Sequence, residues 1–208
     1  TGLFKILNIL KKKKISGKCN LVIIYTNNNG PNYWVDMIIS YINTKLDYKL
    51  FDRIIRPFKI NGKIVEMCRT SNNKSHKDLL SCANLPNNSK ICFIDDTFHG
   101  DMEHKNVTYI FIHPYIYNLD YDEIYKKYYR ANTSLFSKYN KTEAEFNRYM
   151  NKHVVNDVAR VDKTIVEKNI DLLISDKIIR DILLFLGDEH NYTKKKRTRF
   201  VRNRTYRI

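Results

Sequence analysis

Short apolar runs alternate with polar turns and with helical patterns along the first half of the chain. Three runs rich in β-branched and aromatic residues have the length of buried strands, at residues 20–25, 90–95 and 107–112. Segments in which apolar residues recur at helical spacing lie before and between them, at residues 1–10, 31–46 and 75–80. Strands separated by amphipathic helices predict an α/β fold with a parallel sheet.

A hairpin is expected to interrupt this order. Asn61 and Gly62 stand between two short alternating runs, 58–60 and 63–65. Asn-Gly is the strongest short-range signal for a two-residue turn that joins antiparallel strands. The pattern therefore predicts a small β-hairpin between the strand-helix unit and the next helix.

From residue 120 onward the pattern is helical. We expect helices at residues 122–136, 142–154, 164–174 and 175–187. Thr142 and Glu145 have the spacing of a capping box, in which each side chain bonds the backbone N–H of the other residue. Ser175 is expected to cap the last helix and Gly187 to end it. The elements predict three parts: an α/β domain at 1–119, a helical extension at 120–188, and a basic tail at 189–208 that is disordered without a partner.

Positive charge is concentrated at the two ends of the chain. The net charge is +15; six lysines occur before residue 20 and eight Lys or Arg residues after residue 190, with no acidic residue among them. Basic ends are typical of proteins that bind nucleic acid or an anionic membrane surface, or that carry a nuclear address, and a merely solvated end is the alternative. No apolar run reaches the length of a membrane span.

The cysteines do not have the spacing of a metal site. Cys19, Cys68, Cys82 and Cys92 lie in or beside apolar runs without a C-x-x-C pair. We expect them to be small core side chains of a protein in an intracellular, reducing compartment.

The run at residues 90–95 ends abruptly in two adjacent carboxylates, Asp95 and Asp96. Ligands of open α/β sheets bind just beyond the carboxyl ends of the strands. Two neighbouring carboxylates repel each other there unless a cation lies close to both, and Mg²⁺ prefers such hard oxygen ligands. The pair therefore indicates either a magnesium site or a solvated Asp-Asp turn.

Three polar pairs at strand ends or helix starts follow one another as Thr26-Asn27, Lys77-Asp78 and Asp95-Asp96. In this order and spacing, residues 1–115 resemble the haloacid dehalogenase-like superfamily of phosphohydrolases. They resemble most its NLI-interacting-factor branch, the RNA polymerase II carboxy-terminal-domain phosphatases. The chain is also similar to proteins of this type in large DNA viruses. The resemblance implies a three-layer, Rossmann-like domain with a parallel sheet.

The resemblance also implies a role for each pair. The Thr26 hydroxyl and the backbone N–H groups near Asn27 would bind phosphoryl oxygens. Lys77 would give positive charge to the phosphate and the nucleophile, with Lys74 as the competing residue. Asp95 and Asp96 would hold Mg²⁺, one of them directly and the other beside it or in support.

The family's first motif, Asp-x-Asp-x-Thr, does not occur in the chain. In the family its first Asp forms a covalent aspartyl-phosphate and its second is the general acid. We therefore expect the chain to be inactive as it stands. It would become a Mg²⁺-dependent phosphatase for a phosphoprotein or a nucleic-acid phosphate when an upstream segment supplies the motif. The alternative is an inactive scaffold that binds nucleic acid through its basic ends.

Two further groups leave two interpretations each. His99, Asp101 and His104 follow the acidic pair and form either a transition-metal site or, as their spacing favours, a polar loop over the site. Seven tyrosines between residues 109 and 129 lie among basic residues. They form either a stacking surface for nucleic acid or, as we favour, an aromatic helix face packed on the sheet.

Overall fold

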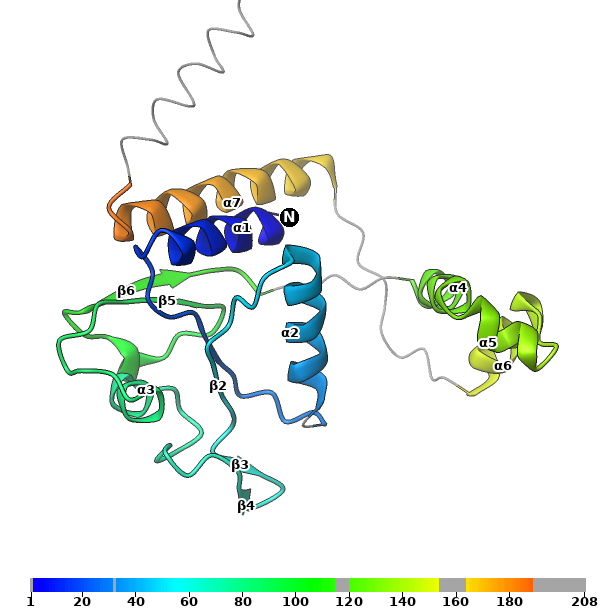
Figure 1. Cartoon of the computed structure of the whole chain (residues 1–208), viewed down its shortest axis with the longest axis horizontal. Helices are drawn as coiled ribbons and strands as arrows, with labels where there is room; N and C mark the ends of the chain where they lie inside the picture. The colour runs from blue at the N-terminus through cyan, green and yellow to red at the C-terminus, as the bar shows by residue number, and fades with distance from the viewer. Residues whose placement is uncertain (1, 32, 115–119, 154–163, 189–208) are drawn as a thin grey trace, which may run out of the picture. The chain divides into compact units, whose positions relative to one another are not determined.

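The chain is mixed α/β, as the pattern predicts. The computed structural model describes residues 2–31, 33–114, 120–153 and 164–188 (Figure 1). The chain divides into a first unit, Thr1–His113 with Asn169–Ile208, and a second unit, Pro114–Lys168. This division differs from the predicted one, because residues 169–188 cluster with the α/β unit rather than with the other helices. The tail at 189–208 lies outside the described residues.

Two separate pairs of parallel strands form the β-structure at the centre of the first unit. Strand β1 (Ile23–Tyr25) pairs with β2 (Arg53–Ile55), and β5 (Ile91–Asp95) pairs with β6 (Val107–Phe111). Three of these strands fall within predicted runs. The apolar pattern did not reveal β2, because it has only three residues and begins with an exposed arginine.

The predicted hairpin is confirmed. Strands β3 (Lys59–Ile60) and β4 (Lys63–Ile64) pair antiparallel around Asn61 and Gly62. Both turn residues have positive φ, 50° and 79°, which is the backbone that a two-residue hairpin requires and that Asn-Gly tolerates best.

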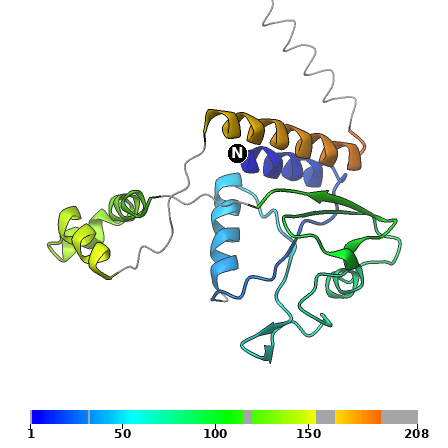
Figure 2. The same cartoon turned by 180° about the vertical axis from the view of Figure 1, so that it is seen from behind.

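Helices α1 (Leu3–Ile15) and α7 (Ile165–Phe185) lie side by side in both views of the first unit (Figures 1 and 2). Lys5 pairs with Asp176 at 3.1 Å, and Lys13 and Lys18 both reach Asp188. The helices approach closely at Gly2, where a Cβ atom would lie 3.0 Å from the Cβ of Ser175.

Helix α7 corrects the prediction of two helices at 164–174 and 175–187. Ser175 lies inside one continuous helix and does not cap anything. The helix begins directly after Thr164, which exchanges hydrogen bonds with Glu167 in a capping box. Gly187 follows the last turn with φ of 72°, as expected of a helix-ending glycine.

The remaining helices of the first unit complete two apolar cores. Helix α2 (Tyr33–Leu46) packs against α1, and helix α3 (His76–Ala83) against β2; a short 3₁₀ turn, η1 (Gly100–Met102), precedes β6. One core lies among the strands and α3 and contains Ile55, Leu79, Cys82, Phe93 and Met102. The other lies between α1 and α2 and contains Leu7, Ile42, Leu46 and Leu50.

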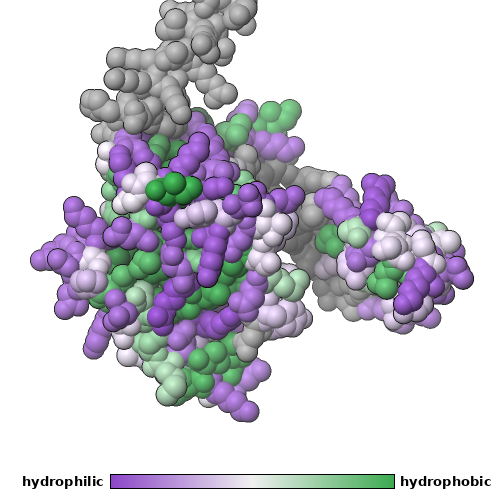
Figure 3. Space-filling model, viewed as in Figure 1, coloured by the Kyte–Doolittle hydropathy of each residue, from purple (hydrophilic) through white to green (hydrophobic). Residues whose placement is uncertain are grey.

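The apolar face of α2 is only partly covered. Ile42 and Leu46 are buried, whereas Trp34, Met37 and Tyr41 stay about half exposed. In the view of Figure 3 the first unit presents mainly hydrophilic side chains, and an apolar area lies at the end that carries β3 and β4. Ile64 of β4 and Met67 after it are exposed there.

The second unit is a set of three short helices with an aromatic core. They are α4 (Tyr121–Ala131), α5 (Thr133–Lys138) and α6 (Glu143–His153). The single helix expected at 122–136 is wrong, because the chain breaks at Asn132, whose φ is −123°. The capping box of Thr142 and Glu145 is confirmed by reciprocal hydrogen bonds of 2.9 and 3.2 Å.

The tyrosines of α4 pack against other helices of the second unit. The ring of Tyr129 lies 4.7 Å from that of Phe136, and the rings of Phe136 and Phe146 are 4.8 Å apart. Tyr128 stacks on Phe146 at 5.7 Å. Tyr115 and Tyr117 lie outside the described residues.

None of the helices within the described ranges combines the length and the apolar character that crossing a membrane requires.

Candidate functional site

Asp95, the last residue of β5, is the acidic centre of the candidate site. Its side chain is 9% exposed, and its Oδ2 atom lies 2.5 Å from the ammonium of Lys74, whose side chain is 10% exposed. Its Oδ1 atom accepts the backbone N–H of Thr97 at 2.9 Å. Both oxygens of the carboxylate are therefore hydrogen-bonded, and the buried negative charge has a buried positive partner.

The segment before α3 holds Lys74 in place. Ser75 caps α3 by accepting the backbone N–H of Asp78 at 3.1 Å, and the backbone N–H of Ser75 donates to the hydroxyl of Tyr25 at 3.2 Å. The Lys74 ammonium lies 5.8 Å from the ring centre of Tyr25 and 5.9 Å from that of Phe93. Because Tyr25 ends β1 and Phe93 belongs to β5, the two strand pairs meet on either side of this ammonium.

Arg69 ties the end of β1 to the same segment. It is 2% exposed, and one guanidinium nitrogen donates to the carbonyl of Thr26 and, at 2.8 Å, to Oδ1 of Asn27. The other nitrogen donates to the carbonyls of Asn72 and Asn73. The guanidinium also lies 4.7 Å from the ring centre of Tyr25. A planar group with several donors can fix two loops at once, which a lysine cannot do.

Thr26 and Asn27 follow directly after β1. The Thr26 hydroxyl accepts the backbone N–H of Asn28 at 3.0 Å, so the turn after β1 is closed on itself. The amide of Asn27 donates to the carbonyl of Asn72 at 2.8 Å. The structure thus brings Thr26, Asn27, Lys74 and Asp95 into one neighbourhood through Arg69 and Tyr25.

Lys77 and Asp96 have a different environment from Lys74 and Asp95. Both side chains are exposed, and neither forms a hydrogen bond or an ion pair with another described residue. Asp78, next to Lys77, is 1% exposed and accepts the backbone N–H and the hydroxyl of Thr70. The lysine that meets the carboxylate of β5 is therefore Lys74, the competitor, while Lys77 stands at the surface of α3.

His99 lies beside the Oδ1 atom of Asp95. The Nε2 atom of His99 lies 3.6 Å from Oδ1 of Asp95. Burial, the largest cause, lowers the pKa of His99 below its ordinary value of 6.5, although Asp95 acts in the opposite direction. The hydroxyl of Tyr109 donates to the carbonyl of Thr97 at 2.8 Å and accepts the backbone N–H of His99 at 3.1 Å. The loop after β5 is therefore held by strand β6.

The ring of His104 lies away from His99 and stacks on the ring of His76 at 4.0 Å. His99, Asp101 and His104 do not form a metal-ligand set in the described part of the chain. Asp101, in η1, is exposed.

Strand β1 has an unpaired backbone edge. The carbonyl of Val22 accepts from Asp52, and the N–H of Thr26 donates to Ile55. The backbone N–H and C=O groups of the even-numbered residues of β1 thus point toward β2. In a parallel pair, the residues between them direct their N–H and C=O groups to the other side. The backbone groups of Ile23 and Tyr25 point away from β2, and no other described strand pairs with them.

Strand β5 has the same property on the side away from β6. Ile91 donates to the carbonyl of Asn106, and the carbonyl of Asp95 accepts from Ile112, so odd-numbered residues face β6. The backbone groups of Cys92 and Ile94 face the unpaired side. Strands β1 and β5 therefore each have an unpaired edge within the described residues, and the buried Lys74–Asp95 pair lies where these two strands end.

The described residues offer two carboxylates to a divalent cation at this place. Mg²⁺ is commonly held by one or two carboxylates together with water and phosphate oxygens, so Asp95 and Asp96 are of the right chemical kind. Asp95 already binds Lys74, and Asp96 is exposed. The only set of three His, Cys, Asp or Glu ligands that gathers within the described ranges lies elsewhere, at Glu66, Cys68 and Cys82.

Two of the cysteines differ from the expectation of four unlinked thiols. Cys68 and Cys82 form a disulfide, with Cα atoms 5.0 Å apart, while Cys19 and Cys92 are free. This pairing could not be predicted from the sequence, because the two residues are fourteen positions apart and lack a recognisable spacing.

The N-terminal lysines are engaged inside the first unit. Lys11 donates to the carbonyl of Leu46 at 2.6 Å, at the carboxyl end of α2, where a cation is favourable. Lys14 donates to the carbonyl of Leu50 and to the carboxylate of Asp52. These ammonium groups fix helix packing and leave less free positive charge at this end than the sequence indicates.

No family model, curated protein or solved structure matches the chain.

Proposed function

We propose that the first unit is the phosphoryl-binding part of a haloacid dehalogenase-like phosphohydrolase. The observation that carries the proposal is the buried Lys74–Asp95 pair at the carboxyl ends of two parallel strands, each with a free edge. Ligands of parallel sheets bind at such ends. A buried ammonium and a carboxylate beside each other are the charges that phosphate and Mg²⁺ need.

The proposed catalytic fold contains one more strand. A segment upstream of Thr1 would pair with the free edges of β1 and β5 and give the parallel order β2, β1, added strand, β5, β6. Two-stranded sheets are marginal by themselves, and three or more strands with a covered face are needed for independent stability. The half-exposed apolar face of α2 supports the same proposal, because an added segment can cover apolar surface as well as pair with strands.

In the proposed reaction the added strand carries Asp-x-Asp-x-Thr and ends beside Asp95. Its first Asp attacks the phosphorus of a phosphomonoester and the alcohol leaves, and water then releases phosphate from the aspartyl-phosphate. Asp95 and Asp96 would hold Mg²⁺, which neutralises the phosphoryl oxygens. Thr26 and the N–H groups near Asn27 would bind those oxygens. We assign to Lys74 the positive charge that the sequence pattern gave to Lys77.

The test uses a chain extended upstream by its own coding sequence, assayed on p-nitrophenyl phosphate with and without Mg²⁺. We expect Mg²⁺-dependent turnover that Asp95→Asn lowers by about 100-fold or more, because it removes charge stabilisation at the reacting group. Asp101→Asn, which changes an exposed carboxylate six positions on, is the matched control and should keep the activity.

The two lysines are separated in the same assay. Lys74→Gln should lose activity like Asp95→Asn, and Lys77→Gln should keep it. The opposite result would return the role to Lys77. An extended chain without turnover, or one in which Asp95→Asn has no effect, contradicts the enzyme proposal.

A second candidate function is nucleic-acid binding through the basic tail. Eight Lys or Arg residues after residue 190 have no acidic neighbour, whereas several N-terminal lysines are engaged by Asp52, Asp176 and Asp188. We expect truncation after Asp188 to remove most retention of DNA or RNA, with a salt dependence of about −0.9 in log–log slope per phosphate contact on duplex DNA. Equal retention by the full and truncated chains at physiological salt would exclude this function for the tail.

A further inference from the structure

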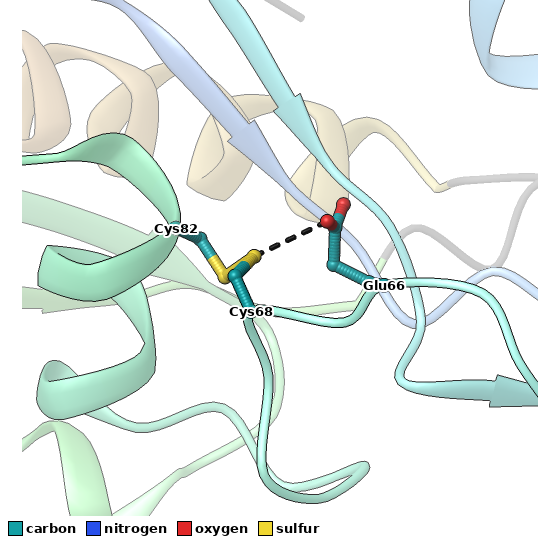
Figure 4. A group of neighbouring side chains, drawn as sticks. All are labelled: Glu66, Cys68 and Cys82. Carbon is teal, nitrogen blue, oxygen red and sulfur yellow. Dashed lines mark hydrogen bonds between the residues drawn. A yellow bond between two sulfur atoms is a disulfide. The ribbon is translucent and has the colours of Figure 1, made fainter.

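Glu66, Cys68 and Cys82 bring three metal-binding atoms together away from Asp95 (Figure 4). Their ligand atoms all lie within 4.8 Å of one another. Cys82 comes from α3 and is fully buried, whereas Glu66 and Cys68 come from the segment after β4 and are partly buried. The three positions are thus held by a helix on one side and by a fixed loop on the other.

The carboxylate of Glu66 is oriented toward the sulfur atoms. One of its oxygens, Oε2, accepts the backbone N–H of Arg56 at 3.1 Å. The other, Oε1, lies 3.1 Å from Sγ of Cys68 (Figure 4). A disulfide sulfur has no proton to donate, so this contact is a hydrogen bond only when Cys68 is a reduced thiol.

We propose that Glu66, Cys68 and Cys82 bind Zn²⁺ when the disulfide is reduced. Two thiolates and one carboxylate are ligands that Zn²⁺ accepts, and water takes the fourth tetrahedral position. The backbone N–H of Arg56 on Oε2 acts as the outer hydrogen bond that orients a metal-binding carboxylate. The disulfide is the oxidised, metal-free form of the same site.

The two forms interconvert by a balanced exchange. Two molecules of a monothiol such as glutathione reduce the disulfide to two thiols and become one glutathione disulfide. Zn²⁺ then binds both sulfurs and the carboxylate, and the two thiol protons are released to solvent. In a reducing compartment, where a cysteine pair more often binds metal than forms a disulfide, Zn²⁺ would replace the covalent link.

The zinc site lies at the two ends of a loop that carries buried charged residues. The chain between Cys68 and Cys82 contains Arg69, Lys74 and Asp78, the three buried charged residues that organise the candidate phosphate site. Either a disulfide or a bound Zn²⁺ closes the ends of this loop. The proposal is independent of the phosphohydrolase proposal, because the zinc site has its own ligands and its test needs no enzymatic activity.

The test uses the full chain with Cys19→Ser and Cys92→Ser, so that only the proposed pair carries thiols. After reduction and removal of the reductant under nitrogen, Zn²⁺ is added and bound metal is measured by equilibrium dialysis. Co²⁺ is added in a parallel sample, because thiolate ligation gives a charge-transfer absorption in the near ultraviolet. We expect one Zn²⁺ per chain, the Co²⁺–thiolate band, and protection of both cysteines from alkylation.

Three variants in this background make the result specific. Cys68→Ser should abolish the Co²⁺–thiolate band and most Zn²⁺ retention. Glu66→Gln should keep the band but weaken Zn²⁺ affinity at least about tenfold. Replacing residues that only orient metal ligands already lowers metal affinity by this amount. Glu103→Gln changes an exposed carboxylate outside the site and should have no effect.

The choice of variants avoids a folding artefact. Cys68 and Glu66 are only partly buried, so their replacement disturbs the core less than replacement of Cys82, which is fully buried. Circular dichroism of each variant serves to check that it is folded. The proposal is overturned if the reduced parent binds no more Zn²⁺ than Cys68→Ser, or if Glu66→Gln binds Zn²⁺ as tightly as the parent.

Discussion

The two units bury different kinds of side chain. In the first unit the described core includes four charged residues, Arg69, Lys74, Asp78 and Asp95, beside its aliphatic side chains. In the second unit the only buried side chain among the described residues is Tyr125, and stacked aromatic rings fill the space between the helices. Buried charge costs free energy and has to be matched by particular partners, whereas apolar packing tolerates many side chains of similar volume. The first unit therefore depends on particular pairs of residues for its stability, whereas the second depends mainly on apolar volume.

The largest expected effect tests the buried charge. Asp95→Ala leaves the Lys74 ammonium buried without its carboxylate, which typically costs about 3–5 kcal/mol of unfolding free energy. Urea denaturation of the full chain measures it. The matched control is Asp96→Ala, an exposed neighbour, for which we expect a change within about 0.5 kcal/mol.

A double-mutant cycle sharpens the same point. If the cost of Asp95→Ala is that of an unpaired charge, Lys74→Met combined with Asp95→Ala should recover a large part of it. A double variant whose loss of stability equals the sum of the two single losses would show that the two residues act independently, and the first unit would then resemble the second.

A smaller effect is expected in the aromatic core of the second unit. Phe146 contacts the rings of Tyr128 and Phe136 and is partly exposed, so Phe146→Ala should cost about 2–3 kcal/mol, below the range for fully buried rings. Phe146→Leu keeps apolar volume and should cost less than about 1.5 kcal/mol. The analogous conservative change in the first unit, Asp95→Asn, should be tolerated less well. If Phe146→Leu and Asp95→Asn cost the same unfolding free energy, the contrast between the two units would not hold.

Local signals in the sequence were sufficient where local interactions decide the structure. The hairpin around Asn61 and Gly62 and the capping box of Thr142 and Glu145 depend on neighbours within a few residues, and both are confirmed. Ser175 carried a capping signal, but it lies within the continuous helix α7, where it faces Gly2. Short edge elements such as β2 are stabilised by pairing and not by their own pattern, so the sequence did not indicate it.

The candidate site was predictable in part for the same reason. Asp95 ends an apolar run, so its place at a strand end could be read from the pattern. Its partner is twenty-one residues away, and no local rule distinguishes Lys74 from Lys77. Arg69 lies in a polar loop and cannot be told from an exposed arginine by sequence, although its guanidinium donates to five groups from three segments of the chain. Long-range pairing of this kind requires the folded chain.

The pH dependence of stability should also differ between the units. Burial, the main cause, lowers the pKa of both His99 and His76 below 6.5 in the first unit, and the charge of His104 adds to the effect at His76. Below pH 6.5 the unfolded chain takes up protons that the folded chain does not, so the unfolding free energy falls as the pH falls from 7 to 5. Above pH 7 this contribution is fully present.

Urea denaturation at several pH values checks the sign. His99→Gln and His76→Gln should each flatten the decrease between pH 7 and 5, and the double variant should flatten it most. His153→Gln, an exposed histidine of the second unit, is the control and should leave the slope unchanged. A stability that rises toward pH 5 in the parent chain would contradict the assignment of these two histidines.

The smallest expected effect has opposite signs in the two units. The hydroxyl of Tyr125 is buried in the second unit and has no hydrogen-bond partner among the described residues, so Tyr125→Phe removes an unsatisfied polar group and should raise the Tm of the full chain slightly. The hydroxyl of Tyr109 in the first unit donates to Thr97 and accepts from His99, so Tyr109→Phe removes two hydrogen bonds and should lower the Tm by a few degrees. The same atom is deleted in both variants, and thermal unfolding followed by circular dichroism compares them directly. A lower Tm for both variants would mean that the hydroxyl of Tyr125 finds a partner in solution, and the aromatic core of the second unit would then depend on polar contacts as the first unit does.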